Sequence, residues 1–179
     1  MEIKENKENK ENKENKENKE NNEINEIKVL KLHPDAIIPQ YAHIGDSGAD
    51  LFAVEDTNWV PIISDNYIVG WKACVKTGLA IELPPGYEWQ VRSRSGLAIK
   101  NNISIKNSPG TIDNEFIGEI CLIIECIGDR PRDMTLCIPK GTKLAQGVIS
   151  KIEYAKFVVV EKLNPTKRGK NGFGSTDKK

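Results

Sequence analysis

The chain has 179 residues, 26 Lys and Arg against 26 Asp and Glu, and 38% hydrophobic residues. A chain of this length buries roughly two thirds of its surface in one domain and needs no disulfide or metal for stability. No apolar run approaches the roughly 20 residues that span a bilayer. The balanced charge argues against a general binder of nucleic acid or of anionic membranes.

The first 23 residues differ in composition from the rest of the chain. They contain six Lys, eight Glu and seven Asn, but only two apolar residues. Lys-Glu-Asn repeats six times between Lys4 and Asn21, so like charges would meet at every i,i+3 contact of a helix. We therefore predict that residues 1–23 form a disordered, low-complexity tail. The eight Glu and the absence of Arg argue against an organelle presequence.

Two interpretations of this tail remain open. One is a solvated extension produced by repeat expansion. The other is a degradation signal, because Lys-Glu-Asn resembles the KEN box that a cell-cycle ubiquitin ligase reads. The sequence gives no partner for the tail.

The four cysteines point to a reducing compartment. They form no C-x-x-C pair and lie inside apolar runs, at Cys74, Cys121, Cys126 and Cys137. We expect buried, reduced thiols in an intracellular protein, in the cytoplasm or the nucleus.

The tail is followed by many short runs rich in Val and Ile, separated by Pro, Gly, Asn and Asp at intervals of about 8–12 residues, which indicates short strands. The expected strands are Val29–Leu32, Ala49–Val54, Tyr67–Val75, Leu79–Leu83, Tyr87–Arg92, Ile103–Ile105, Glu119–Ile127, Met134–Ile138, Leu144–Ile152 and Lys156–Val160. One short helix is expected over Ser95–Lys100. Because no βαβ alternation appears, we predict an all-β, antiparallel jelly-roll or barrel-like domain over residues 24–163.

Five clusters of Gly, Ser, Asp and Arg fall at turns between these strands, where a rigid scaffold displays side chains. They are Ser47–Ala53, Arg94–Ala98, Asn107–Gly118, Gly141–Gln146 and Arg168–Thr176. Hydroxyls, amides and Gly N–H groups beside Arg are the groups through which proteins bind polyphosphates. Each cluster alone is a weak signal, since most Gly-rich turns are plain hairpins.

The order and spacing of the five clusters resemble the motifs of the trimeric dUTPases, from about Val29 to Thr176. The resemblance implies a homotrimer whose active sites are shared between subunits, and Val/Ile-rich strands such as Cys121–Ile127 would then be covered by another copy. It also implies cleavage of dUTP to dUMP and pyrophosphate by attack of water on the α-phosphorus. Mg²⁺ would be held by the triphosphate and water rather than by a protein cage.

The third motif, by this resemblance, carries the catalytic and nucleoside-binding residues. Asp113 would be the general base that takes the proton of the attacking water. Asn107 would read uracil through its amide, with main-chain help from Gly110 and Ile112. Phe116 stands where the family usually has Tyr, so its ring would still exclude a 2′-hydroxyl from the sugar site while the phenol hydroxyl is lost.

The second and fourth motifs would bind the phosphates. The resemblance assigns this role to Arg94, Ser95, Gly96 and Gln146, while Lys143 replaces the usual Arg. Asp50 of the first motif is a supporting residue with three open roles, which are to order metal-bound water, to pair with an arginine, or to end a strand.

The last motif would form a mobile arm over residues 164–179 that closes on the bound nucleotide and excludes water. The resemblance places Arg168 on the γ-phosphate and stacks Phe173 on uracil. Gly174, Ser175 and Thr176 complete the expected contacts of the arm.

Two other functions are open to the same scaffold. A dCTP deaminase on this fold needs a general-base Glu after the third motif, and Glu125 is the one candidate. A non-catalytic, trimeric nucleotide-binding regulator would show loss of the motif residues, which is not seen.

The segment of residues 55–72 is longer than usual for the family. Its Trp59 and Trp71 could cap the barrel or contact another subunit.

Overall fold

The computed structural model describes residues 26–130, 134 and 137–171. The predicted tail at 1–23 and the end of the predicted arm, including Phe173, Gly174, Ser175 and Thr176, lie outside these residues. The described residues form strands and one short helix, α2 (Ser95–Asn101). The strands are β1 (Lys28–Lys31), β2 (Ala49–Phe52), β3 (Thr57–Asn58), β4 (Val60–Ser64), β5 (Tyr67–Lys76), β6 (Leu79–Glu82), β7 (Tyr87–Ser93), β8 (Ile103–Ile105), β9 (Gly110–Ile112), β10 (Cys121–Ile127), β11 (Cys137–Ile138) and β12 (Lys143–Lys151).

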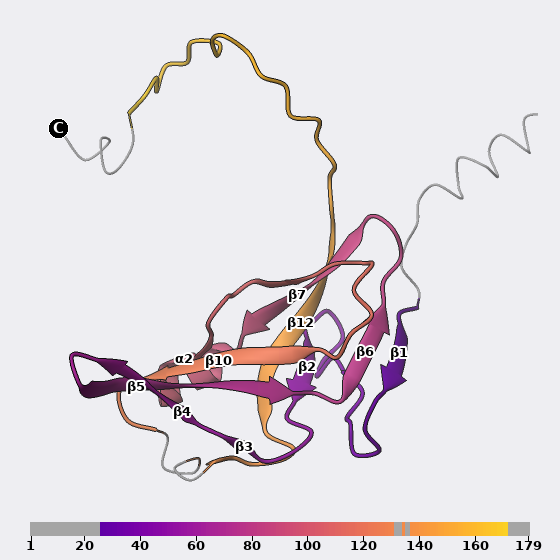
Figure 1. The fold of residues 1–179 in the computed structure, drawn as a ribbon. Coiled ribbons are helices and arrows are strands. Elements are labelled where there is room, and N and C mark those ends of the chain that lie inside the picture. The colour runs from indigo at the N-terminus through magenta and orange to yellow at the C-terminus, as the bar shows by residue number, and fades with distance from the viewer. Residues whose placement is uncertain (1–25, 131–133, 135–136, 172–179) are drawn as a thin grey trace, which may run out of the picture.

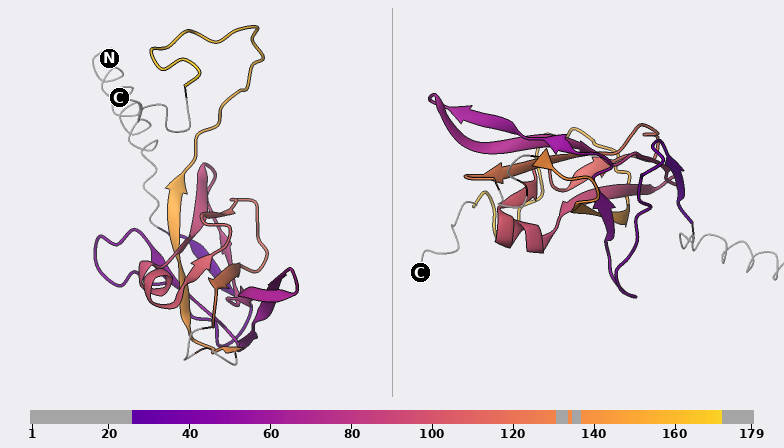
Figure 2. Two further views of the ribbon diagram at one scale, coloured as in Figure 1. Left: turned by 90° about the vertical axis from the view of Figure 1, so that its left-hand side faces the viewer. Right: turned by 90° about the horizontal axis from the view of Figure 1, so that it is seen from below.

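Two four-stranded sheets form the body, with strand orders β4-β5-β10-β8 and β2-β12-β7-β9 (Figures 1 and 2). Two short ladders, β1-β6 and β11-β3, complete the described pairing. Every described strand pair is antiparallel. This confirms the predicted all-β, antiparallel jelly-roll domain with one short helix.

The core lies between the two sheets because strands from both sheets turn alternate apolar residues inward. In β10, Leu122, Ile124 and Cys126 are fully buried, and Ala73 and Val75 of β5 join the same cluster. Residues of β2, β7 and β12 meet them from the other sheet. This period-two burial is what fixes strand register, since a slip of one residue would expose the whole apolar face.

The outer face of β10 is partly apolar, as the sequence predicts. Ile123 and Ile127 are exposed, while Glu125 pairs with Lys106 across 2.7 Å. These side chains leave an apolar strip on a sheet face that the described chain does not cover.

Residues 55–72 contribute a hairpin, β4–β5, that extends from the body (Figure 1). Trp59 precedes it and is buried, with its Nε1 donating a hydrogen bond to the Met134 carbonyl at 2.9 Å. The Arg130 guanidinium lies over the Trp71 ring, 4.2 Å from the ring centroid. Of the two roles considered for these tryptophans, Trp59 therefore closes the core of its own chain.

The prediction of a strand over Lys156–Val160 is wrong for the single chain. Its residues pair with no described strand, and Phe157 and Val159 are 96% and 99% exposed. The segment after β12 leaves the sheets (Figures 1 and 2). Its Val-rich sequence predicts an extended backbone, but a strand also needs a neighbouring strand to pair with its N–H and C=O groups.

The structure adds three short strands that the sequence pattern does not predict, β3, β4 and β9.

The cysteines are free thiols, but the expectation that all are buried is wrong. Cys74 is exposed, Cys121 and Cys137 are half-buried, and Cys126 is buried. Burial raises the pKa of the Cys121 thiol to about 11, with a smaller contribution from Cys74 nearby. Burial likewise raises the pKa of Cys126. Both thiols are therefore protonated and weakly nucleophilic at neutral pH.

The contact between Gly147 and Trp89 fixes how closely β12 and β7 pack. A Cβ added at Gly147 would overlap the indole of Trp89, which is itself buried. We expect Gly147→Ala to lower the free energy of unfolding by about 1–3 kcal/mol, because the indole must move out of a packed core. Urea unfolding at fixed protein concentration measures this change.

A double-mutant cycle with Trp89→Leu is the control for this prediction. If overlap with the indole causes the loss, Gly147→Ala costs less in the Trp89→Leu background than in the wild type. Equal losses in both backgrounds would contradict the explanation.

Candidate functional site

The β2-β12-β7-β9 sheet carries polar residues in rows across its outer face. The register pairs Asp50 of β2 with Gln146 of β12, and Gln146 with Arg92 of β7. Directly paired residues project to the same face of a sheet. A carboxylate, an amide and a guanidinium therefore lie side by side, next to the turn where β7 gives way to α2.

This row opens into a cavity of about 360 Å³. Five residues predicted from the sequence line it together, namely Asp50, Arg94, Ser95, Gly96 and Gln146. The cavity is also lined by Arg92, Lys143 and Asp46, so three cations face two carboxylates. The excess of positive charge suits an anionic ligand.

Asp50 holds two of these cations in place. Its Oδ1 lies 3.2 Å from Arg94 Nε, and its Oδ2 lies 2.8 Å from Lys143 Nζ. The Arg94 Nη1 also donates a hydrogen bond to the Lys143 carbonyl at 3.0 Å. With its side chain only 15% exposed, the Asp50 carboxylate is shielded enough to orient both partners. Of the three roles considered for Asp50, the geometry matches pairing with an arginine.

The Gln146 amide is held from two sides. Its Nε2 donates to the Ser93 carbonyl at 3.2 Å. A Cβ at Gly48 would lie 2.8 Å from Gln146 Oε1, so only glycine lets the chain before β2 approach this side chain. The amide is thus fixed at the cavity wall beside Asp50.

Backbone N–H groups border the same cavity at the start of α2. Arg94 is the N-cap residue with an extended backbone (φ −95°, ψ 126°), and Ser95 and Gly96 form the first turn. N–H groups in the first turn of a helix have no partner within the helix. Together with the Ser95 hydroxyl they can donate hydrogen bonds to phosphate oxygens.

The third motif forms a separate cluster around β9. The Asn107 side chain lies against Gly110, where a Cβ would be 3.1 Å from Asn107 Nδ2. Asp113 follows the end of β9, and its carbonyl accepts a hydrogen bond from the Phe116 N–H at 3.1 Å. Asp113 is exposed. Ile112 turns inward against the core.

The Phe116 ring folds back over Gly118, since a Cβ there would lie 2.7 Å from its Cζ. The ring remains 45% exposed. An aromatic face at the end of the β9 turn is therefore available for contact with a ligand.

The chain does not bring these two clusters together. β9 pairs with β7, but Ile112 lies opposite Trp89, so Asp113 follows toward the end of β7 that is away from α2. The residues around β9 do not line the cavity beside Asp50. Arg168 belongs to neither cluster, because it lies in the exposed segment beyond β12, where its Nε donates to the Asn171 carbonyl at 2.9 Å.

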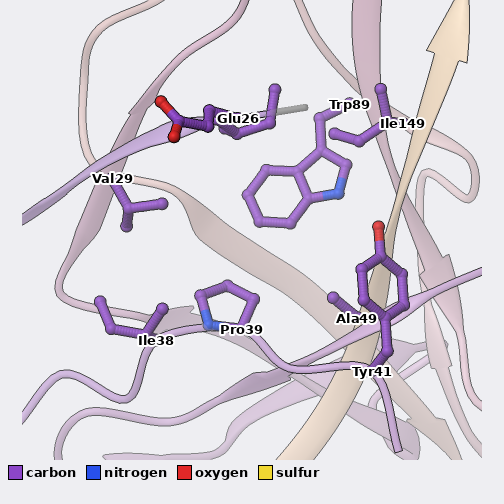
Figure 3. Close-up of a pocket in the computed structure, with 9 residues that line it drawn as sticks. Glu26, Val29, Ile38, Pro39, Tyr41, Ala49, Trp89 and Ile149 are labelled. Carbon is purple, nitrogen blue, oxygen red and sulfur yellow. The ribbon is translucent and has the colours of Figure 1, made fainter. Parts of the chain in front are cut away.

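A second cavity, of about 380 Å³, is mostly apolar (Figure 3). Its lining includes Val29, Ile38, Tyr41 and Ile149 around the Trp89 indole. The buried Trp89 Nε1 has no hydrogen-bond partner among the described residues. This cavity lacks the cations of the first and is suited to apolar side chains.

Sequence reasoning misses several residues of the polar cavity. In the sequence, Arg92 looks like an ordinary outward-facing residue of a strand, and Gly48 like part of a turn. Lys143 stands out only as a departure from the family pattern. The alternation Glu88-Trp89-Gln90-Val91-Arg92 carries a signal for a polar face, but not for what that face binds.

A family model described as dUTPase matches residues 35–177. Among curated proteins, the deoxyuridine 5'-triphosphate nucleotidohydrolase of Wolinella succinogenes is 43% identical over 150 residues, which is 84% of this chain and 93% of that protein. The protein of the same name from Helicobacter pylori strain P12 is 43% identical over 148 residues, or 83% of this chain and 94% of that protein.

Solved structures agree with these relatives. The dUTPase of Staphylococcus bacteriophage 80alpha with dUPNHPP superposes with a TM-score of 0.70 at 28% identity, covering 84% of this chain and 98% of that one. A point mutant of the dUTPase of phage phi11 of S. aureus, described with a structural Mg(II) ion, has a TM-score of 0.64 at 27% identity and covers 79% of this chain and 100% of that one. The chain belongs to the dUTPase family.

Proposed function

We propose that this protein hydrolyses dUTP to dUMP and pyrophosphate, which lowers dUTP and supplies dUMP for thymidylate synthesis. The observation that carries the proposal is the cavity beside Asp50, where residues of three motifs converge with an excess of positive charge. Membership of the dUTPase family supports the same substrate. The substrate class implies an intracellular protein. Separately, no helix in the described part of the chain is long and apolar enough to cross a membrane.

Asp113 is the proposed general base. Water is a poor nucleophile at neutral pH and needs a carboxylate within hydrogen-bond reach. The water oxygen forms a bond to the α-phosphorus, the bond from that phosphorus to the bridging oxygen of pyrophosphate breaks, and the water proton passes to Asp113. Asp113 lies just after β9 and is exposed, which leaves its carboxylate accessible to a substrate.

The polar cavity is the proposed triphosphate site. Arg94, the Ser95 hydroxyl, the Gly96 N–H and the Gln146 amide would donate hydrogen bonds to phosphate oxygens as charge moves to the departing pyrophosphate. Fixed donors are worth most when they need no rearrangement during the reaction. The ion pairs of Asp50 supply that rigidity for Arg94 and Lys143.

The β9 turn is the proposed nucleoside site. Asn107 and the main chain at Gly110 and Ile112 would distinguish uracil from cytosine by their pattern of donors and acceptors. A buried polar group left unpaired by the wrong base costs more than a lost apolar contact, so a small pocket can discriminate strongly. Phe116 would pack on the deoxyribose and exclude a 2′-hydroxyl.

Mg²⁺ is the proposed cofactor, held chiefly by the substrate. Both oxygens of Asp50 are within 3.2 Å of cations, and the described residues offer no group of three or more His, Cys, Asp or Glu around one point. The cavity therefore fits an ion whose ligands are phosphate oxygens and water. When bound, Mg²⁺ would neutralise part of the triphosphate charge.

A homotrimer with shared sites is the proposed assembly. Within one chain the residues around β9 do not line the polar cavity, so another copy would supply the missing half of the site. Residues 24–163 would form the body. Residues 164–179 would form an arm that contributes Arg168, Phe173, Gly174, Ser175 and Thr176 to the site. The exposed apolar side chains beyond β12 support burial against another copy.

A deaminase reaction has less support. Glu125, its one candidate base, pairs with Lys106 at 2.7 Å and lies on the β4-β5-β10-β8 sheet, away from the polar cavity. A regulator without catalysis is not favoured by any feature of the cavity.

Replacement of the proposed base tests the chemistry. We expect Asp113→Asn to lower kcat for dUTP by about 10²–10⁴-fold, because the amide cannot accept the water proton. Binding of a non-hydrolysable dUTP analogue should persist. Turnover assays with dUTP, dTTP, UTP and dCTP plus Mg²⁺ measure both rate and selectivity.

Asp65→Asn is the matched control for Asp113→Asn, because Asp65 lies exposed at the tip of the β4–β5 hairpin. Full activity of Asp113→Asn would remove Asp113 from its role. Ammonia release from dCTP would contradict the proposed reaction itself.

The Asp50 carboxylate is expected to act by holding Arg94 and Lys143 in position, not by contributing its negative charge to the cavity. We expect Asp50→Asn to lower kcat about tenfold or more, because Arg94 and Lys143 lose their common anchor. The affinity for a dUTP analogue should fall less, since the cavity becomes more positive. Steady-state kinetics together with titration of the analogue separate the two effects, and an unchanged kcat would show that the anchor is dispensable.

The assembly can be tested at the exposed segment beyond β12. We expect Phe157→Glu to dissociate the trimer, because a charged side chain would replace an apolar one at the proposed contact. Light scattering coupled to size-exclusion chromatography measures the mass. Lys156→Glu, which changes the charge of the neighbouring residue, should leave the trimer intact. A wild-type protein with the mass of a monomer would contradict the proposed assembly.

A further inference from the structure

Arg92 lies in the polar cavity but belongs to none of the five motifs. It lies on β7, directly opposite Gln146 of β12, and its side chain lines the cavity together with Arg94 and Ser95. Paired residues on neighbouring strands project to the same face, so Arg92 shares that face with Gln146 and Asp50.

A chain of side-chain hydrogen bonds along β7 orients the Arg92 guanidinium. Both Nε and Nη2 of Arg92 donate to Gln90 Oε1, and Gln90 Nε2 donates to Glu88 Oε1 at 2.6 Å. The Glu88 carboxylate accepts only, so it fixes the Gln90 amide with its oxygen toward Arg92. A guanidinium has five N–H donors, and this arrangement uses two of them.

Arg92 also differs from the other cavity cations in its charge balance. Arg94 and Lys143 share the Asp50 carboxylate at 3.2 and 2.8 Å. Among the ion pairs of the described residues, none involves Arg92, whose described side-chain partner is the neutral amide of Gln90. Its full positive charge is therefore available to an anion in the cavity, and its side chain is exposed to reach one.

We propose that Arg92 is an additional triphosphate-binding residue and that Gln90 is its positioning residue. The proposal rests on dUTP as the substrate. Charge-assisted hydrogen bonds from a guanidinium to phosphate are among the strongest polar contacts in proteins. Arg92 strengthens binding of the triphosphate to the wall formed by β7 and β12, beside the ion-paired Arg94.

Calorimetric titration of the full-length protein with a non-hydrolysable dUTP analogue and Mg²⁺ tests this role. We expect Arg92→Gln to weaken binding about tenfold, with a comparable rise in KM for dUTP and a smaller change in kcat. The salt dependence of binding should become less steep, because one ionic contact is lost. Arg92→Lys should recover part of the affinity.

Gln90→Met tests the positioning role because it keeps side-chain volume and removes the acceptor of Arg92. We expect a loss of affinity smaller than that of Arg92→Gln, and no further loss when the two are combined. Lys151→Gln removes an exposed charge at the end of β12 and should leave affinity unchanged.

Three outcomes would overturn the inference. They are unchanged affinity of Arg92→Gln, an affinity loss with an unchanged salt dependence, and an equal loss in Lys151→Gln. Failure of the proposed function looks different, because the wild-type protein would then neither bind the analogue nor cleave dUTP.

Discussion

The register of β12 between β2 and β7 is the constraint on which the site depends. It places Asp50, Gln146 and Arg92 in one row across the sheet. A shift of one residue would turn Gln146 into the core and bring buried Ala145 or Gly147 into the row. Such a shift would also place a residue with a side chain where Gly147 now lies, and that side chain would overlap the Trp89 indole. Core packing therefore stabilises the register on which the arrangement of these cavity residues depends.

The arrangement of the two clusters also bears on the proposed sharing of sites between copies. The proposed donors for phosphate gather near β2, β12 and the start of α2, while the residues proposed to bind the nucleoside gather around β9. Although β9 pairs with β7, the residues around β9 do not line the polar cavity of the described chain. A second copy that places its β9 turn against the polar cavity would solve the problem, and apolar surface beyond β12 is available to hold copies together.

Much of the fold could be predicted from the sequence, because the alternation of Val and Ile with other residues indicates which face of a strand is buried. β10 and β12 begin and end close to the expected residues, and α2 ends one residue later than expected. Lys156–Val160 fails because β-propensity indicates an extended backbone but not whether a partner strand lies in the same chain. Motif order is enough to find Arg94, Ser95, Gly96 and Gln146. Arg92 and the double ion pair of Asp50 could not be found, because both depend on register across strands distant in sequence.

Mixing two inactive variants tests the shared site most directly. Asp113→Asn lacks the proposed base and Arg94→Gln lacks a phosphate ligand, so each homotrimer should be inactive. After unfolding and refolding together, random assortment of subunits should restore about a quarter of the sites, because each complete site draws the two clusters from different copies. Recovery of dUTP hydrolysis to that level is the predicted result. No recovery, from mixed trimers shown to have formed, would contradict the account.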